Sequence, residues 1–150
     1  MIRVRIAVVD DDASHVELLR EVLEDEGYEV VVSVDLRDAV VLVKDQRPTL
    51  VILDLFQARQ LIGLDVVHQL KADRETRDIP VVVISADTAA LRTNAAELRM
   101  YGVVAMGKPY GLDELLSNIQ GAVDGRARAA ASALHVAEGA SDRTGSPRHD

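Results

Sequence analysis

Leu50–Asp54, with the sequence LVILD, consists of four apolar residues followed by a carboxylate. The run is short, contains β-branched residues and begins just after Pro48, so we expect a β-strand that is buried on both faces. Asp54 then lies at the carboxyl end of this strand. In open α/β sheets, ligands bind in the crevice beyond the carboxyl ends of the strands. Asp54 is therefore the first candidate for a functional residue.

Three further apolar runs end in polar residues in the same way. Residues 6–9 (IAVV) precede three aspartates, residues 81–84 (VVVI) precede a serine, and residues 103–107 (VVAMG) precede a lysine. The polar residues concerned are Asp10, Asp11, Asp12, Ser85 and Lys108. In a parallel sheet, we expect these side chains to reach the same edge as Asp54.

Amphipathic segments separate the apolar runs. Ser14–Glu17 matches a capping box that opens a first helix, Asp35 is positioned to cap a second, and Thr88–Met100 is a helix-prone fourth segment. Tyr28–Val34 alternates enough to form a half-buried strand at the sheet edge. Five strands and five helices thus alternate along the chain. This order predicts an α/β fold with a doubly wound, five-stranded parallel sheet and helices on both faces.

Residues 1–123 are expected to form this domain, and residues 124–150 a separate extension. After Val123 the composition changes to Gly, Ala, Ser and Arg. Residues 127–137 are able to prolong the last helix, whereas residues 138–150 have too little apolar content to become ordered. We therefore predict an Ala/Arg-rich helical extension that ends in a disordered tail.

The composition limits the class of protein. The chain of 150 residues is 48% hydrophobic, which suits one domain with a sizeable core, and it contains no cysteine for disulfides or thiolate metal sites. The net charge is −8, and residues 1–123 contain 13 Lys and Arg against 21 Asp and Glu. Such an acidic body argues against direct nucleic-acid binding, which relies on basic surfaces.

The apolar segments also argue against a membrane protein. None of them approaches the roughly 20 residues that span a bilayer. The run near the N-terminus is too short for a signal peptide, and it meets Asp10–Asp12 where a cleavage site would lie. We therefore expect a cytoplasmic protein without membrane contact.

Asp10, Asp11 and Asp54 are expected to be neighbours between the first and third strands. Three ionised carboxylates repel one another, and a hard divalent cation is the natural remedy. Mg²⁺ binds one or two carboxylates, a carbonyl and several waters, which leaves positions for a phosphoryl oxygen. Asp54 can then attack a phosphoryl group as a nucleophile, while Lys108 supplies a second positive charge and Ser85 a hydrogen bond to the product.

The sequence resembles the receiver domain of bacterial two-component response regulators, of the single-domain type. Four motifs carry the resemblance: Val8–Asp11, Val51–Asp54, Ile84–Ala86 and Lys108–Tyr110. Each motif alone is weak, but the four occur together, in order, and each closes a predicted strand. The similarity covers about residues 3–123.

The resemblance implies a flavodoxin-like sheet with strand order 2-1-3-4-5. It implies that Asp54 accepts a phosphoryl group from the phosphohistidine of a sensor histidine kinase or phosphotransfer protein, so that the chain promotes its own phosphorylation without being a conventional enzyme. The implied Mg²⁺ ligands are Asp10, Asp11, Asp54 and the backbone carbonyl of Phe56. Ser85 is the implied switch hydroxyl, and Lys108, before a cis Pro109, contacts the phosphoryl group. Phosphorylation would alter a surface for an unidentified downstream protein, with a homodimer as a further partner.

Three positions depart from the family pattern. Ala58 replaces a proline that usually follows the phosphorylated aspartate by four residues, and one residue is inserted before Gly63. The loop from Phe56 to Ile62 is therefore expected to be reshaped. Ala105 replaces a residue that is often aromatic. His15 is expected to be a surface helix residue and His68 a helix-flank residue. Neither is expected to be a metal ligand, because neither has a second histidine or cysteine at metal spacing.

Two other classes of function remain open. The altered loop and Ala105 are compatible with a receiver-like adaptor that works without phosphorylation. An aspartyl-phosphate phosphatase of the haloacid-dehalogenase type fits less well, because that class needs a second acid where this chain has Phe56. A dinucleotide-binding enzyme fits worst, because acids rather than a Gly-rich turn follow the first strand.

Overall fold

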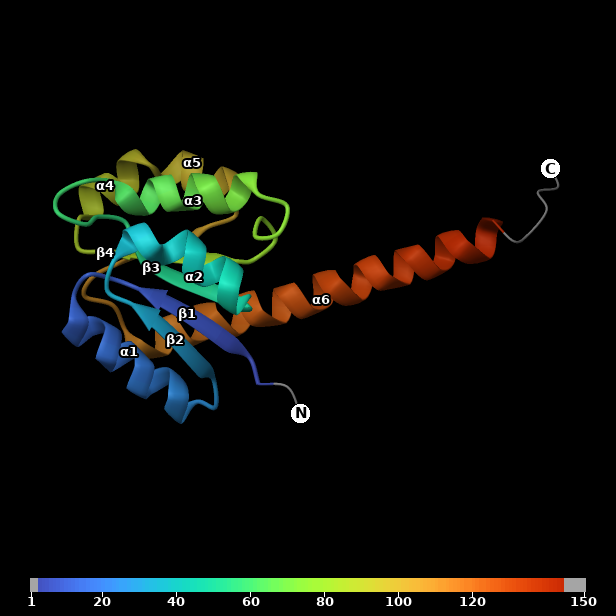
Figure 1. Cartoon of the computed structure of the whole chain (residues 1–150), viewed down its shortest axis with the longest axis horizontal. Helices are drawn as coiled ribbons and strands as arrows, with labels where there is room; N and C mark the ends of the chain where they lie inside the picture. The colour runs from blue at the N-terminus through green and yellow to red at the C-terminus, as the bar shows by residue number, and fades with distance from the viewer. Residues whose placement is uncertain (1–2, 145–150) are drawn as a thin grey trace.

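A five-stranded parallel sheet forms the centre of the structure (Figure 1). The computed structural model describes residues 3–144, with side chains up to Ala129. The strands are β1 (Arg5–Val9), β2 (Glu29–Ser33), β3 (Leu50–Asp54), β4 (Val81–Ser85) and β5 (Val104–Gly107). Their order in the sheet is β2-β1-β3-β4-β5, which confirms the flavodoxin-like prediction.

Helices cover both faces of this sheet. They are α1 (Ala13–Asp25), α2 (Ala39–Gln46), α3 (Ile62–Ala72), α4 (Thr88–Thr93), α5 (Ala95–Met100) and α6 (Leu112–Thr144), with a 3-10 turn, η1 (Leu36–Asp38), before α2. Figure 1 shows α1 and α6 on one face of the sheet and the other helices on the opposite face. The doubly wound arrangement predicted from the sequence is therefore confirmed.

The side chains of β3 explain why its sequence is a continuous apolar run. Val51 and Leu53 are buried in one core cluster with residues of α2 and α3, whereas Leu50 and Ile52 are buried in a second cluster with residues of α1 and α6. Successive strand residues point to opposite faces, so a strand that is covered on both sides needs an apolar residue at every position. The run ends at the half-buried Asp54, the last residue of the strand, and the next residue, Leu55, is again buried in the core.

The N-terminus of α1 differs from the predicted capping box. Asp12, rather than Ser14, is the capping residue, and its carboxylate accepts hydrogen bonds from the backbone N–H groups of Ser14 and His15. The Ser14 hydroxyl donates to the same carboxylate at 2.6 Å. The carboxylate is the better cap because its charge also interacts favourably with the positive end of the helix dipole.

The predicted fourth helix, Thr88–Met100, is divided, so the structure contains six α-helices in its described part rather than five. Asn94 separates α4 from α5, with φ −101° and ψ 8°. Its side-chain amide donates to the Ala90 carbonyl at 2.8 Å. Asparagine competes with the helical backbone for hydrogen bonds in this way, which accounts for the break.

Helix α6 is longer than predicted. It continues without interruption from Leu112 to Thr144 and projects away from the sheet (Figure 1). The segment from Glu138 to Thr144, expected to be disordered, is thus helical, and only residues 145–150 of the predicted tail lie outside the described part. Alanine has the highest helix propensity, and the alanine-rich composition before Glu138 favours continuation. None of the described helices combines the length and apolarity needed to cross a membrane.

Candidate functional site

Three aspartates meet at the carboxyl ends of β1 and β3. Oxygen atoms of Asp10, Asp11 and Asp54 all lie within 4.8 Å of one another. Asp10 is buried, Asp54 is half-buried and Asp11 is exposed. This is a set of hard oxygen donors of the kind that Mg²⁺ prefers, and the exposure of Asp11 leaves the cluster open to solvent. The predicted neighbours are therefore brought together.

Lys108 joins two of these carboxylates from the end of β5. Its Nζ lies 3.2 Å from Oδ2 of Asp10 and 3.3 Å from Oδ2 of Asp54. Burial alone would lower the pKa of Lys108, but the two carboxylates outweigh burial and raise it. The backbone N–H of Lys108 donates to the Ser85 carbonyl at 2.9 Å, and the Lys108–Pro109 peptide bond is cis, as predicted. Lys108 is thus a positively charged partner of both Asp10, which follows β1, and Asp54, which ends β3.

Asp10 and Asp54 differ in their protonation behaviour. Burial raises the pKa of Asp54, and the neighbouring negative charge of Asp10 adds to this effect, against hydrogen bonds from Phe56 and Lys108. Burial also opposes ionisation of Asp10, but hydrogen bonds from His15 and from the backbone of Asp12, together with the charge of Lys108, lower its pKa overall. Asp10 therefore ionises more readily than Asp54, whose ionised form is disfavoured by burial and by the negative charge of Asp10.

Gly63 packs directly against the backbone of Asp54. A Cβ at this position would lie 2.0 Å from the Asp54 carbonyl oxygen and 2.7 Å from Leu55 Cα. The backbone N–H of Gly63 donates to the Leu55 carbonyl at 3.0 Å. Only glycine allows α3 to begin this close to the end of β3.

The loop between Phe56 and Gly63 has a turn where relatives usually carry a proline. Ala58 and Arg59 have φ values of 51° and 63°, and Gln57 and Gln60 exchange two backbone hydrogen bonds of 3.0 Å. Both central residues are thus left-handed, a conformation that usually requires glycine or asparagine. The turn gives the loop a defined shape, and its difference from the family's loop stays a prediction.

The side chain of Gln57 fixes this turn to the neighbouring loop. Its carbonyl oxygen accepts from the Leu36 N–H at 2.6 Å, and its amide donates to Asp35 Oδ1 at 2.8 Å. The same Asp35 pairs with Arg37, and these contacts hold the pKa of Asp35 well below its usual range. The loops after β2 and β3 are therefore linked by hydrogen bonds.

Ser85 ends β4 beside the acidic cluster. It is buried, and its Oγ accepts a hydrogen bond from the Asp87 N–H at 3.1 Å. A cavity of about 380 Å³ is lined by Asp54, Phe56, Arg59, Ser85, Ala86 and Asp87. Asp54 and Ser85 therefore face one space that is large enough for a phosphoryl group.

His15 is part of the site, although the sequence indicated a surface position. Its side chain is only 11% exposed. Nδ1 lies 2.6 Å from Asp10 Oδ2, and Nε2 lies 2.8 Å from the hydroxyl of Tyr110. Side chains in a helix lean toward its N-terminus, so a histidine in the first turn of α1 reaches back to the end of β1. The place of His15 in the first helical turn after Asp10 was therefore the feature of the sequence from which this contact could have been predicted.

Ala105 is the remaining departure from the family pattern, and Tyr101 and Tyr110 each interact with a histidine. Ala105 is exposed on β5. Tyr101 is half-buried beside His68 of α3, which lies 2.5 Å from Glu97 Oε2 of α5. Tyr110 points instead to His15. His68 is thus a link between two helices, away from the acidic cluster.

A known protein family matches most of the chain. The sequence profile of the response regulator receiver domain matches residues 6–120. The chain belongs to this family. Members of the family are signalling domains rather than conventional enzymes.

Individual relatives agree with this assignment. The response regulator MprA of Mycolicibacterium vanbaalenii is 38% identical over 122 residues, which cover 78% of this chain and 49% of MprA. The polar-differentiation response regulator DivK of Brucella anthropi is 29% identical over 116 residues, covering 77% of this chain and 92% of DivK. The chain thus spans about half the length of MprA but nearly all of DivK.

The receiver fold is also found in solved structures. A CheY-like response regulator receiver domain protein from Methanospirillum hungatei superimposes with a TM-score of 0.75, covering 85% of this chain and 98% of that chain, at 21% identity. At this identity the likeness concerns the fold.

Proposed function

We propose that the chain is a phosphorylatable signalling receiver that accepts a phosphoryl group on Asp54 from a sensor histidine kinase or phosphotransfer protein. One observation carries the proposal. The carboxylate of Asp54 lies 3.3 Å from Lys108 Nζ, shares a cluster with Asp10 and Asp11, and lines the same cavity as Ser85. Family membership supports the same assignment.

Asp10, Asp11 and Asp54 would hold Mg²⁺, together with the backbone carbonyl of Phe56. The fit rests on three carboxylate oxygens that lie within 4.8 Å of one another. The ion would offset negative charge on the transferring phosphoryl group. The lowered pKa of Asp10 keeps this ligand ionised at a lower pH than an ordinary aspartate.

Phosphoryl transfer uses the side chains around Asp54. A carboxylate oxygen of Asp54 attacks phosphorus, the new O–P bond forms as the N–P bond of the donor phosphohistidine breaks, and the imidazole nitrogen keeps the electron pair and takes up a proton. Lys108 stabilises the charge that develops on the phosphoryl oxygens. The Ser85 hydroxyl can rotate to donate a hydrogen bond to the product.

The consequence of phosphorylation is a changed binding surface. Residues 1–123 form the receiver domain in this proposal, and residues 124–150 form an extension of its last helix. The coverage of DivK supports a mode in which the receiver contacts a separate downstream protein or a second copy of itself in the cytoplasm. The acidic body supports an output that does not involve direct contact with nucleic acid.

Incubation with acetyl phosphate and Mg²⁺, followed by intact mass measurement, tests this proposal. The wild-type protein should gain the mass of one phosphoryl group, and Asp54→Asn should gain none. Asp45→Asn, an exposed substitution on α2, is the matched control and should be labelled like wild type. Undiminished labelling of Asp54→Asn would refute the assignment.

A receiver-like adaptor without phosphorylation is the second candidate. It is favoured by the left-handed turn at Ala58 and Arg59 and by the exposed Ala105, both of which depart from the family pattern. In this case the same experiment would give no mass increase in wild-type protein, even though Mg²⁺ still binds.

A further inference from the structure

A second cavity lies at the opposite edge of the sheet from Asp54. It has a volume of about 320 Å³, and its lining includes Pro48 just before β3, Ile79 just before β4, and Arg126 of α6. In a parallel sheet, the amino ends of the strands lie at the edge away from their carboxyl ends. This volume is near the lower end of the range for small-molecule sites.

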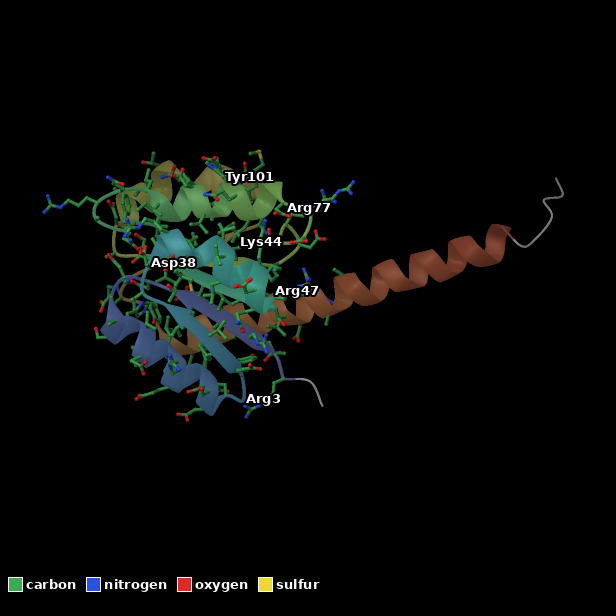
Figure 2. All side chains as sticks on the ribbon, in the orientation of Figure 1. Arg3, Asp38, Lys44, Arg47, Arg77 and Tyr101 are labelled. Carbon is green, nitrogen blue, oxygen red and sulfur yellow. The ribbon has the colours of Figure 1, made fainter. Side chains whose placement is uncertain are left out.

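Cationic side chains dominate the lining of this cavity. Lys44, Arg47 and Arg126 contribute positive charge, and Glu75 is the acid among the lining residues. Figure 2 shows Lys44 and Arg47 on the side of the body from which α6 projects. Lys44 pairs with Asp73 at 2.6 Å, so its charge is offset. The two arginines therefore leave the lining with a net positive charge even after Glu75 is counted, in a chain whose net charge is −8.

Neither arginine is neutralised by an acid. Among the described residues, no ion pair involves Arg47 or Arg126. The Nη1 atom of Arg126 is also buried without a hydrogen-bond partner in the described part of the chain. Leaving a buried donor unsatisfied is unfavourable, and it is more so for a charged group. Within the described part of the chain, the half-buried Arg126 thus has no anionic partner.

The backbone at Arg47 is held in an uncommon conformation. Arg47 ends α2 with φ 47° and ψ 58°, which is the left-handed region. It also precedes Pro48, a position at which extended conformations are strongly preferred. Residues in sparsely populated backbone regions often cluster where a ligand is held. This conformation brings Arg47 to the cavity wall.

Lys71 lies close enough to Arg126 for their charges to interact. Its Nζ donates to the carbonyls of Arg77 and Ile79 at 3.1 and 2.9 Å. Burial lowers the pKa of Lys71, and the charge of Arg126 lowers it further against the opposing effect of Asp78. The ammonium of Lys71 is thus already bonded to two carbonyls, and Lys71 is not among the residues that line the cavity.

We propose that this cavity binds a small oxyanion, a phosphate- or carboxylate-bearing molecule held by the guanidinium groups of Arg47 and Arg126. A guanidinium presents a planar fork of donors that matches both groups. The bound anion would connect the end of α2 to α6 beyond Val123. It would therefore fix the direction in which α6 leaves the body, independently of phosphorylation at Asp54.

Backbone amide shifts during titration with inorganic phosphate, and separately with citrate, test this proposal. Both titrations use the full chain in Mg²⁺-free buffer at constant ionic strength. We expect saturable shifts at residues 44–47, 75–79 and 126, and none at residues 85–88. Saturation by phosphate but not citrate identifies a phosphate site, and the reverse identifies a carboxylate site.

Three variants separate a specific site from diffuse attraction. Arg126→Gln should weaken binding about tenfold or more, as expected for loss of a hydrogen bond to a charged group. Arg47→Gly should weaken binding to a similar degree while keeping the fold, because glycine adopts this backbone conformation without strain. Arg128→Gln removes one exposed charge from the same helix and should leave the affinity unchanged. Linear shifts without saturation, or equal weakening by Arg128→Gln, would overturn the proposal.

Discussion

The two edges of the parallel sheet carry opposite charge. At the carboxyl edge, Asp10, Asp11 and Asp54 form an acidic cluster and Lys108 pairs with Asp10 and Asp54, whereas at the amino edge Arg47 and Arg126 line a cavity. The acids follow the strands directly, so the sheet itself positions them. The arginines come from a helix end and from α6, so they depend on how the helices pack. The strands thus position the negative charge at the carboxyl edge. The helices packed around the sheet position the positive charge at the amino edge.

The largest stability effect is expected at the carboxyl edge, from Gly63→Ala. The added Cβ would lie 2.0 Å from the Asp54 carbonyl oxygen, a backbone atom that cannot move without disturbing β3. We expect a loss of about 3 kcal/mol or more in the free energy of unfolding, measured with urea.

Gly121→Ala is the matched control for that substitution. Its Cβ would meet nothing within 4 Å, and alanine is favoured over glycine in a helix, so the variant should gain about 0.5–1 kcal/mol. Similar losses in the two variants would show that the close contact at Gly63 is absent in solution.

Mg²⁺ should act only on the carboxyl edge. At about 100 times its dissociation constant, the ion should raise the free energy of unfolding by about 2.7 kcal/mol, and Asp11→Ala should remove most of this gain. Asp12→Asn retains a capping oxygen and should leave the gain unchanged. Thermal unfolding with and without Mg²⁺ measures this. An equal gain in Asp11→Ala would mean that the acids form only a capping turn.

The raised pKa of Asp54 predicts a pH-dependent difference between wild type and Asp54→Asn without Mg²⁺. The folded state holds this proton more tightly than the unfolded chain, so ionised Asp54 destabilises the fold at neutral pH. Asp54→Asn should therefore be the more stable protein at about pH 7, and its advantage should vanish as the pH falls through the folded-state pKa. Urea unfolding across this range tests the sign. An advantage that grows toward acid pH would contradict it.

The smallest effects are expected at two non-glycine residues with a left-handed backbone conformation, Ala58 near the carboxyl edge and Arg47 at the amino edge. Ala58→Gly near Asp54 and Arg47→Gly at the amino edge should each stabilise the chain by about 0.5–1 kcal/mol, because the strain at Ala58 and Arg47 exceeds the entropic disadvantage of glycine. Ala89→Gly, exposed on the helix α4, should instead destabilise it by a similar amount. Destabilisation in all three variants would argue against strain at the two turns.

The carboxyl edge could largely be predicted from the sequence. Continuous apolar runs identify strands that are covered on both faces, and the residue after each run must lie at the sheet edge. Asp10, Asp54, Ser85 and Lys108 were found in this way, because a strand determines where its last side chain lies.

The remaining features depend on tertiary packing. The contact of His15 with Tyr110 joins residues 95 positions apart, and no local pattern pairs them. The turn at Ala58 and Arg59 was not predictable in shape, since neither residue favours positive φ. The division at Asn94 was missed because the flanking sequence is rich in helix formers. The amino-edge cavity likewise depends on the path of α6.

We expect phosphorylation of Asp54 to act through Ser85 on the segment that follows β4. Ser85 is buried and accepts a hydrogen bond from the Asp87 N–H, so a move of its hydroxyl toward the phosphoryl group would release that N–H. Hydrogen exchange of backbone amides across residues 86–92, before and after treatment with acetyl phosphate and Mg²⁺, measures this directly. We expect a phosphorylation-dependent change in wild type and its loss in Ser85→Ala, with mass spectrometry showing that both proteins carry the phosphoryl group. A full change in phosphorylated Ser85→Ala, or no change in phosphorylated wild type, would contradict the account.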